Sequence, residues 1–258
     1  MTGGLRTAVD AAGVATLTLD RPAKRNALTA DMWAALPGVL DTLAADPAVR
    51  ALVLVGAAGT FSAGADIDEL YDSYGEPDAA DAFHAINVAA EVALAGFAHP
   101  TIAAVEGACV GGGCQLAVAC DLRFAAADAT FAVPPARLGV VYPATATVRL
   151  AGLVGPARAK YLLYSAAPID AHRAFAYGLV DEVVPGDVVE RAVAFAAGIA
   201  ANSAQTIGAA GDVLRAHLAG RDPDGAAAPW ERRSRTAPDV REGLAAFRER
   251  RAPRFHPD

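Results

Sequence analysis

The feature that most constrains the fold is an order of segments that occurs twice: a short, wholly apolar run followed by a glycine-bearing turn. Residues 51–55 precede a turn at 61–70, and Thr101–Val105 precedes a glycine-rich segment at 107–122. Short runs of apolar residues alone are typical of strands that are buried on both faces. The chain is therefore expected to bring these two turns close together beside a buried sheet.

The neighbouring segments fit a layered α/β fold. Val14–Leu19 alternates as a strand does, and Thr29 is expected to cap a helix that stops before Pro47. A helix is expected at Gly112–Ala119, followed by another strand at Leu122–Ala126.

Later segments are rich in strong helix formers, which predict helices at 188–201 and 206–218 and a last amphipathic helix before Pro253. Two stretches carry turn-forming residues instead. We expect an exposed, mobile loop at 69–80 and a polar connection at 220–228.

Length and composition allow one large core, because the chain has 258 residues of which 54% are hydrophobic. No apolar run approaches the ~20 residues that cross a bilayer, and the first residues do not read as a signal peptide. We therefore expect a cytoplasmic protein with no membrane partner. The net charge of -7 argues against a nucleic-acid partner, since phosphate binding normally needs a basic surface.

Cys109, Cys114 and Cys120 lack the spacing of a structural zinc site. We interpret them as small buried thiols and expect no metal site.

The two glycine turns have a possible chemical use. Glycine before a helix lets backbone approach a ligand closely, and the first N–H groups of a helix have no partner within it. Two such donors that converge form an oxyanion hole. The alternative is that each turn is only a tight packing turn.

Five motifs occur in order along almost the whole chain: RPAKRNAL at 21–28, AGAD at 63–66, IAAVEGACVGGGCQLAVACDL at 102–122, GLVDEVVP at 178–185 and EGLAAFRERRAPRF at 242–255. Together they resemble the crotonase (enoyl-CoA hydratase/isomerase) superfamily. The resemblance implies a spiral of ββα turns over residues 1–200 that holds an acyl-CoA site. Residues 201–258 would form a helical oligomerisation segment of a homotrimer or homohexamer. Coenzyme A would enter as part of the substrate, with no separate cofactor.

Carried over by position, the resemblance assigns the oxyanion-hole N–H groups to Ala65 and Gly112. Lys24 could meet a CoA phosphate or be an ordinary surface lysine, and Asp66 could also cap its turn. The expected CoA contacts are Lys24, Asn26, Ala27, Leu28, Ala63, Asp66 and Ile67.

The sequence departs from the hydratases at two catalytic positions, where Gln115 and Pro135 replace glutamates. Hydration needs groups that can titrate, and each positioned acid or base typically contributes ~10²- to 10⁴-fold. Ordinary hydration is therefore not expected.

Three functions remain open. Residues 138–150 resemble the methylmalonyl-CoA decarboxylases, with Tyr142 at the position of an active-site tyrosine, although those enzymes carry histidine where Ala65 stands. Tyr142 could contact a carboxylate, donate a proton or simply wall the pocket. Hydratase or isomerase chemistry could use displaced groups such as Tyr142 or His84. The third possibility is a non-catalytic acyl-CoA carrier or regulator.

Overall fold

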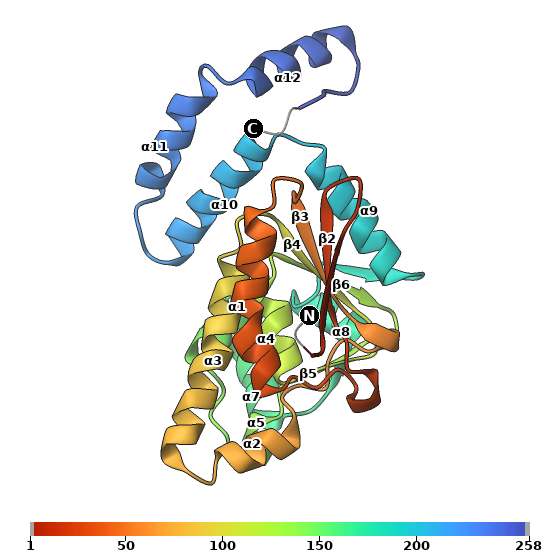
Figure 1. The fold of residues 1–258 in the computed structure, drawn as a ribbon, viewed down its shortest axis with the longest axis vertical. Helices are drawn as coiled ribbons and strands as arrows, with labels where there is room; N and C mark the ends of the chain where they lie inside the picture. Colours follow the sequence, from red (N-terminus) through yellow and green to blue (C-terminus); the bar gives the residue numbers. More distant parts are fainter. Residues whose placement is uncertain (1–2, 256–258) are drawn as a thin grey trace.

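The main sheet of the computed structural model, which describes residues 3–255, runs through the middle of the molecule (Figure 1). Its strands are parallel except that the first pairs antiparallel with the second. In spatial order they are β1 (Leu5–Val9), β2 (Val14–Leu19), β3 (Ala51–Gly56), β4 (Thr101–Val105), β6 (Leu122–Ala126) and β9 (Glu182–Val184).

A smaller sheet lies beside the glycine turns and contains β5 (Ala108–Val110), β7 (Thr130–Ala132) and β8 (Ile169–Asp170). Short 3-10 turns occur at Pro22–Lys24 and Ala57–Gly59. The α-helices are α1 (Ala30–Ala45), α2 (Ile67–Ser73), α3 (Pro77–Ala95), α4 (Gly112–Ala119), α5 (Pro135–Leu138), α6 (Ala144–Val154), α7 (Pro156–Ser165), α8 (Ala171–Tyr177), α9 (Val188–Ala200), α10 (Ala204–Leu218), α11 (Pro223–Ser234) and α12 (Pro238–Glu249).

Two apolar layers explain why β3 is wholly apolar. Leu52 and Leu54 belong to the core that also contains residues of α1, α3 and α4, whereas Val53 and Val55 pack in the core under α9. Successive side chains of a strand point to opposite faces, so a strand covered on both faces must be apolar at every position. The predicted buried strands are confirmed.

The helix after β2 begins as expected. Thr29 caps α1 by accepting a hydrogen bond from the N–H of Met32 at 3.2 Å. The helix ends at Ala45, just before Pro47, and it accommodates Pro37 inside it. The expected helix at Gly112–Ala119 and strand at Leu122–Ala126 are also confirmed.

Both segments expected to be irregular are largely helical. Residues 69–80 contain the end of α2 and the start of α3, where Pro77 is the first helical residue. Residues 220–228 contain the start of α11, whose N-cap Asp222 accepts from the N–H groups of Asp224 and Gly225. The predictions were wrong because proline and aspartate at these positions start helices, where proline's missing N–H costs nothing.

The last three helices extend away from the main sheet. Figure 1 shows α10 above the sheet and α11 and α12 farther out. α10 packs against α11, and the exposed side of this arm carries apolar side chains such as Leu218, Leu244 and Phe247. Among residues 3–255, no helix is both long and apolar enough to span a membrane.

Candidate active site

A pocket of about 190 Å³ opens where the two glycine turns meet α3 and the segment between β7 and α6. Most of its surface is apolar. Its lining residues are Ala63, Gly64, Ala65, Ile67, Leu70, Tyr74, Phe83, His84, Asn87, Gly111, Gly112, Gln115, Pro134, Pro135, Leu138, Val140, Val141, Tyr142 and Pro143.

The two glycine turns lie side by side, as the sequence predicted. Ser62 and Cys109 form a parallel bridge, and the N–H of Val110 donates to the carbonyl of Ser62 at 2.9 Å. Gly64 has φ of +101°, and a Cβ there would lie 2.9 Å from the carbonyl oxygen of Val110. Glycine is therefore required for the two backbones to approach this closely.

The N–H groups of Ala65 and Gly112 are neighbours in this arrangement. A Cβ built on Gly112, the first residue of α4, would lie only 3.4 Å from the nitrogen of Ala65. Neither N–H has a hydrogen-bond partner among the described residues, and both residues line the pocket. Two unpaired donors beside a helix N-terminus can hold an anionic oxygen.

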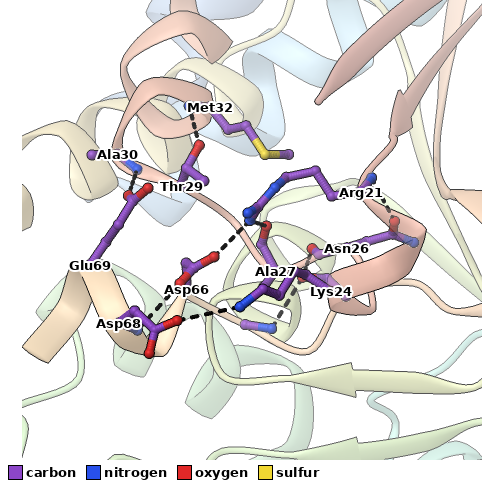
Figure 2. A network of polar contacts seen from close by, with 12 residues as sticks. Arg21, Lys24, Asn26, Ala27, Thr29, Ala30, Met32, Asp66, Asp68 and Glu69 are labelled. Carbon is purple, nitrogen blue, oxygen red and sulfur yellow. Dashed lines mark hydrogen bonds and ion pairs between the residues drawn. The ribbon is translucent and has the colours of Figure 1, made fainter. Parts of the chain in front are cut away.

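The segment 21–28 holds the first turn in place (Figure 2). Leu28 forms a parallel bridge with Ala65, and its carbonyl accepts from the N–H of Asp66 at 2.8 Å. The hydroxyl of Ser62 donates to the carbonyl of Asn26 at 2.8 Å and accepts from the N–H of Gly64 at 3.1 Å. These bonds fix the backbone that carries the Ala65 N–H.

The side chain of Asn26 serves this internal scaffold, and the expected CoA contact around Asn26, Ala27 and Leu28 stays a prediction. The side chain is fully buried, accepts from the N–H of Arg21 at 2.9 Å and donates to the carbonyls of Ala57 and Thr60. Leu28 is also fully buried and Ala27 is nearly so, because both pack beneath the turn. The backbone N–H and C=O groups of all three are used within the protein.

Asp66 caps α2, in agreement with one of its two expected roles. Its carboxylate accepts from the N–H of Asp68 at 3.2 Å and from the guanidinium of Arg21 at 2.8 Å, as Figure 2 shows. The hydrogen bond from Arg21 holds the pKa of Asp66 below its usual value. Asp66 is buried, so it orients the turn.

The remaining expected CoA contacts are accessible. Lys24 is exposed and forms an ion pair with Asp68 at 3.3 Å. Such exposed pairs contribute little, so the ammonium group is free to turn toward a phosphate, and this role stays a prediction. Ala63 and Ile67 line the pocket, and Ile67 is 56% exposed at its mouth.

Gln115 and Pro135 both line the pocket where the resemblance placed the missing glutamates. Pro135 is the first residue of α5. The buried amide of Gln115 donates to Oδ1 of Asn87 at 2.6 Å and to Oε2 of Glu91 at 3.1 Å. Asn87 and Glu91 were not among the residues predicted from the sequence. Their signal was a polar pair four residues apart on the buried face of α3.

Tyr142 lies against the second glycine turn. Its hydroxyl donates to the carbonyl of Gly111 at 3.1 Å, directly before Gly112 in the chain. Burial raises the pKa of Tyr142 well above its ordinary value, so the hydroxyl stays protonated near neutral pH. His84 also lines the pocket and is exposed.

No Asp, Glu, Lys or Arg side chain is found among the described residues that line this pocket. An apolar pocket with two backbone donors therefore defines the candidate site, and the described residues that line it supply no carboxylate. The structure is therefore that of an α/β protein with two backbone donors placed to hold and polarise a carbonyl oxygen.

Comparison with known proteins identifies the family. Residues 10–258 match the family model of enoyl-CoA hydratase/isomerase, and the chain belongs to this family within the crotonase superfamily. It is 37% identical over 247 residues to a probable enoyl-CoA hydratase of Mycobacterium tuberculosis, covering 94% of each chain. It is 35% identical over 247 residues to the 2,3-dehydroadipyl-CoA hydratase of Escherichia coli, again covering 94% of each.

A solved structure shows the same fold. An enoyl-CoA hydratase/isomerase family protein from Hyphomonas neptunium superposes with a TM-score of 0.94 at 38% identity, with 100% of this chain and 99% of that chain covered. The predicted crotonase-like α/β fold is thereby confirmed.

Proposed function

We propose that the protein binds an acyl-CoA thioester and stabilises its enolate, with the N–H groups of Ala65 and Gly112 around the thioester oxygen. One observation carries this proposal: these two neighbouring donors are unpaired and both belong to residues that line the pocket. Negative charge develops on a thioester oxygen when an enolate forms, so preorganised donors there lower the barrier. Coenzyme A enters as part of the substrate.

Decarboxylation of a malonyl-type CoA is the reaction that suits this pocket best. The bond between Cα and the carboxylate breaks, carbon dioxide leaves, and the electron pair moves to the thioester oxygen. Water or a weak acid then supplies the proton to Cα. These reaction steps need no carboxylate base, and no carboxylate is found among the described residues that line the pocket. A desolvated carboxylate, with no Lys or Arg beside it, is also easier to lose.

The test is incubation with malonyl-CoA, methylmalonyl-CoA and crotonyl-CoA, followed by mass spectrometry of the products. Loss of carbon dioxide is the expected result. Hydration of crotonyl-CoA would instead show that the protein is a hydratase whose acid/base groups lie at other positions. Tyr142 and His84 would then be the groups to test. Tight binding of all three without turnover would assign the non-catalytic carrier or regulator and would contradict the proposed catalysis.

We further propose a homotrimer or homohexamer in the cytoplasm, assembled through the helical arm after residue 200. The support is the set of exposed apolar side chains on the arm: Leu218 is 82%, Leu244 63% and Phe247 84% exposed in the single chain. Exposed apolar patches commonly mark interfaces. Light scattering should give three or six subunits, and Leu244→Asp with Phe247→Asp should lower that number. A monomeric wild-type protein would contradict this proposal.

A further inference from the structure

Glu91 is a buried carboxylate behind the wall of the pocket. It lies on α3 with 0% exposure. One oxygen accepts from the guanidinium of Arg149 at 2.9 Å, and the other accepts from the hydroxyl of Thr145 at 2.6 Å. Burying a charge is costly unless it is paired and hydrogen-bonded, and these contacts from α6 provide that compensation.

The carboxylate of Glu91 dictates how Gln115 is oriented. A carboxylate that faces a guanidinium can only accept hydrogen bonds, so the amide of Gln115 must present its NH₂ group to Glu91. The observed distance from Nε2 of Gln115 to Oε2 of Glu91 is 3.1 Å. Turning the amide over would place two acceptor oxygens against each other.

Gln115 in turn dictates how Asn87 is oriented. Nε2 of Gln115 donates to Oδ1 of Asn87 at 2.6 Å, which requires the carbonyl of Asn87 to face Gln115. The NH₂ group of Asn87 must then face the other way. It has no partner among the described residues, although Asn87 is only 8% exposed and lines the pocket.

Water can pair this donor while the pocket is open, but a ligand that displaces the water and offers no acceptor leaves the donor unsatisfied at a cost. We propose that Asn87 is a specificity-determining residue that donates a hydrogen bond to an oxygen substituent on the acyl group, with Glu91 and Gln115 as the residues that position it. This inference rests on the proposed acyl-CoA function and names the substrate class: acyl groups bearing a hydroxyl or carboxylate are favoured over hydrocarbon acyl groups.

The test compares the Kd values of butyryl-CoA, 3-hydroxybutyryl-CoA and succinyl-CoA by calorimetry. None of these three can lose carbon dioxide through an enolate. We expect at least one oxygen-bearing thioester to bind about 3- to 10-fold more tightly than butyryl-CoA, which is the usual effect of one hydrogen bond. Tighter binding of 3-hydroxybutyryl-CoA would identify the preferred oxygen as a hydroxyl, and tighter binding of succinyl-CoA would identify it as a carboxylate.

Asn87→Leu removes the donor. The ratio between the Kd of butyryl-CoA and the Kd of the preferred oxygen-bearing thioester should then fall to about one. Asn87→Asp is the second variant, because it keeps the oxygen that Gln115 contacts and replaces only the donating NH₂ group. Glu91→Gln should also reduce the preference, because a glutamine there permits Gln115 and then Asn87 to turn over. Asn202→Leu changes an exposed asparagine after α9 and is the matched control.

Two results would overturn this role of Asn87: equal binding of all three thioesters by the wild-type protein, or a preference that persists in both Asn87 variants. Failure of the proposed function would look different, because none of the three thioesters would bind at all.

Discussion

Two regions of the pocket are built in different ways. The backbone frame, which comprises residues 21–28, 62–66 and 110–112, presents main-chain donors that are held by bridges, main-chain hydrogen bonds and the buried side chains of Asn26 and Ser62. The side-chain wall, which comprises Asn87, Gln115, Pro135 and Tyr142, presents side chains instead.

The difference bears on the expectation, drawn from the family resemblance, that Gln115 and Pro135 replace two glutamates. A main-chain donor depends on the path of the chain, so the frame can remain while side chains of the wall are exchanged. Gln115 and Pro135 belong to the side-chain wall, next to a backbone frame that presents both expected donors. The four predictions below test this separation, beginning with the largest expected effect.

Removing one donor from the frame should have the largest effect. A Cβ on Gly112 would lie 2.8 Å from Cζ2 of Trp33, so Gly112→Pro needs the background Trp33→Phe to make room. Proline removes the N–H and is tolerated at the first helical position. We expect the double variant to decarboxylate its malonyl-type CoA substrate ~10²- to 10³-fold more slowly than Trp33→Phe alone, as measured by kcat. Full activity in a folded, CoA-binding double variant would contradict enolate stabilisation at Gly112.

Removing side-chain hydrogen bonds that hold the frame should lower the stability of the fold. Asn26→Ala removes three side-chain hydrogen bonds and places alanine at a φ of +55°. We expect the free energy of unfolding in urea to fall by about 2–4 kcal/mol. Asn202→Ala, at an exposed site, should change it by less than about 0.5 kcal/mol. Equal effects of the two substitutions would show that Asn26 does not support the frame.

Rebuilding the wall should restore some hydration. Gln115→Glu with Pro135→Glu supplies two carboxylates, but the first would face the buried carboxylate of Glu91. Adding Glu91→Gln removes that repulsion. We expect this triple variant to hydrate crotonyl-CoA about tenfold or more faster than wild type, and faster than the double variant. If the folded triple variant hydrates crotonyl-CoA no faster than wild type, the acid/base roles that the family resemblance assigns to positions 115 and 135 are wrong.

Removing the tyrosine hydroxyl should have the smallest effect. Tyr142→Phe loses one hydrogen bond to Gly111, so we expect a stability loss of about 0.5–1.5 kcal/mol near pH 7. The folded-state pKa of Tyr142 is raised. Its stabilisation is therefore complete below the unfolded pKa of about 10 and is lost as pH rises further. The stability difference between wild type and Tyr142→Phe should be constant from pH 7 to about 9 and shrink above about 10. A difference that changes near neutral pH would contradict the raised pKa.

Local sequence determined much of the fold and the frame. The apolar runs at β3 and β4 predicted buried strands, and the glycines at Gly64 and Gly112 predicted close backbone approach. These features follow from the conformational preferences of neighbouring residues and from burial of apolar surface. The helical starts at Pro77 and Asp222 were misread because the same residues also form turns.

Only the tertiary structure decided what the wall contains. Thr145 lies 54 residues from Glu91 in the chain, yet its hydroxyl donates to that carboxylate. Likewise Gln115 meets Asn87 across 28 residues, where α3 packs against α4. Such contacts depend on how distant helices pack, and no local propensity specifies them. The sequence therefore determined which two turns meet beside the pocket, whereas packing between helices decided which side chains line it.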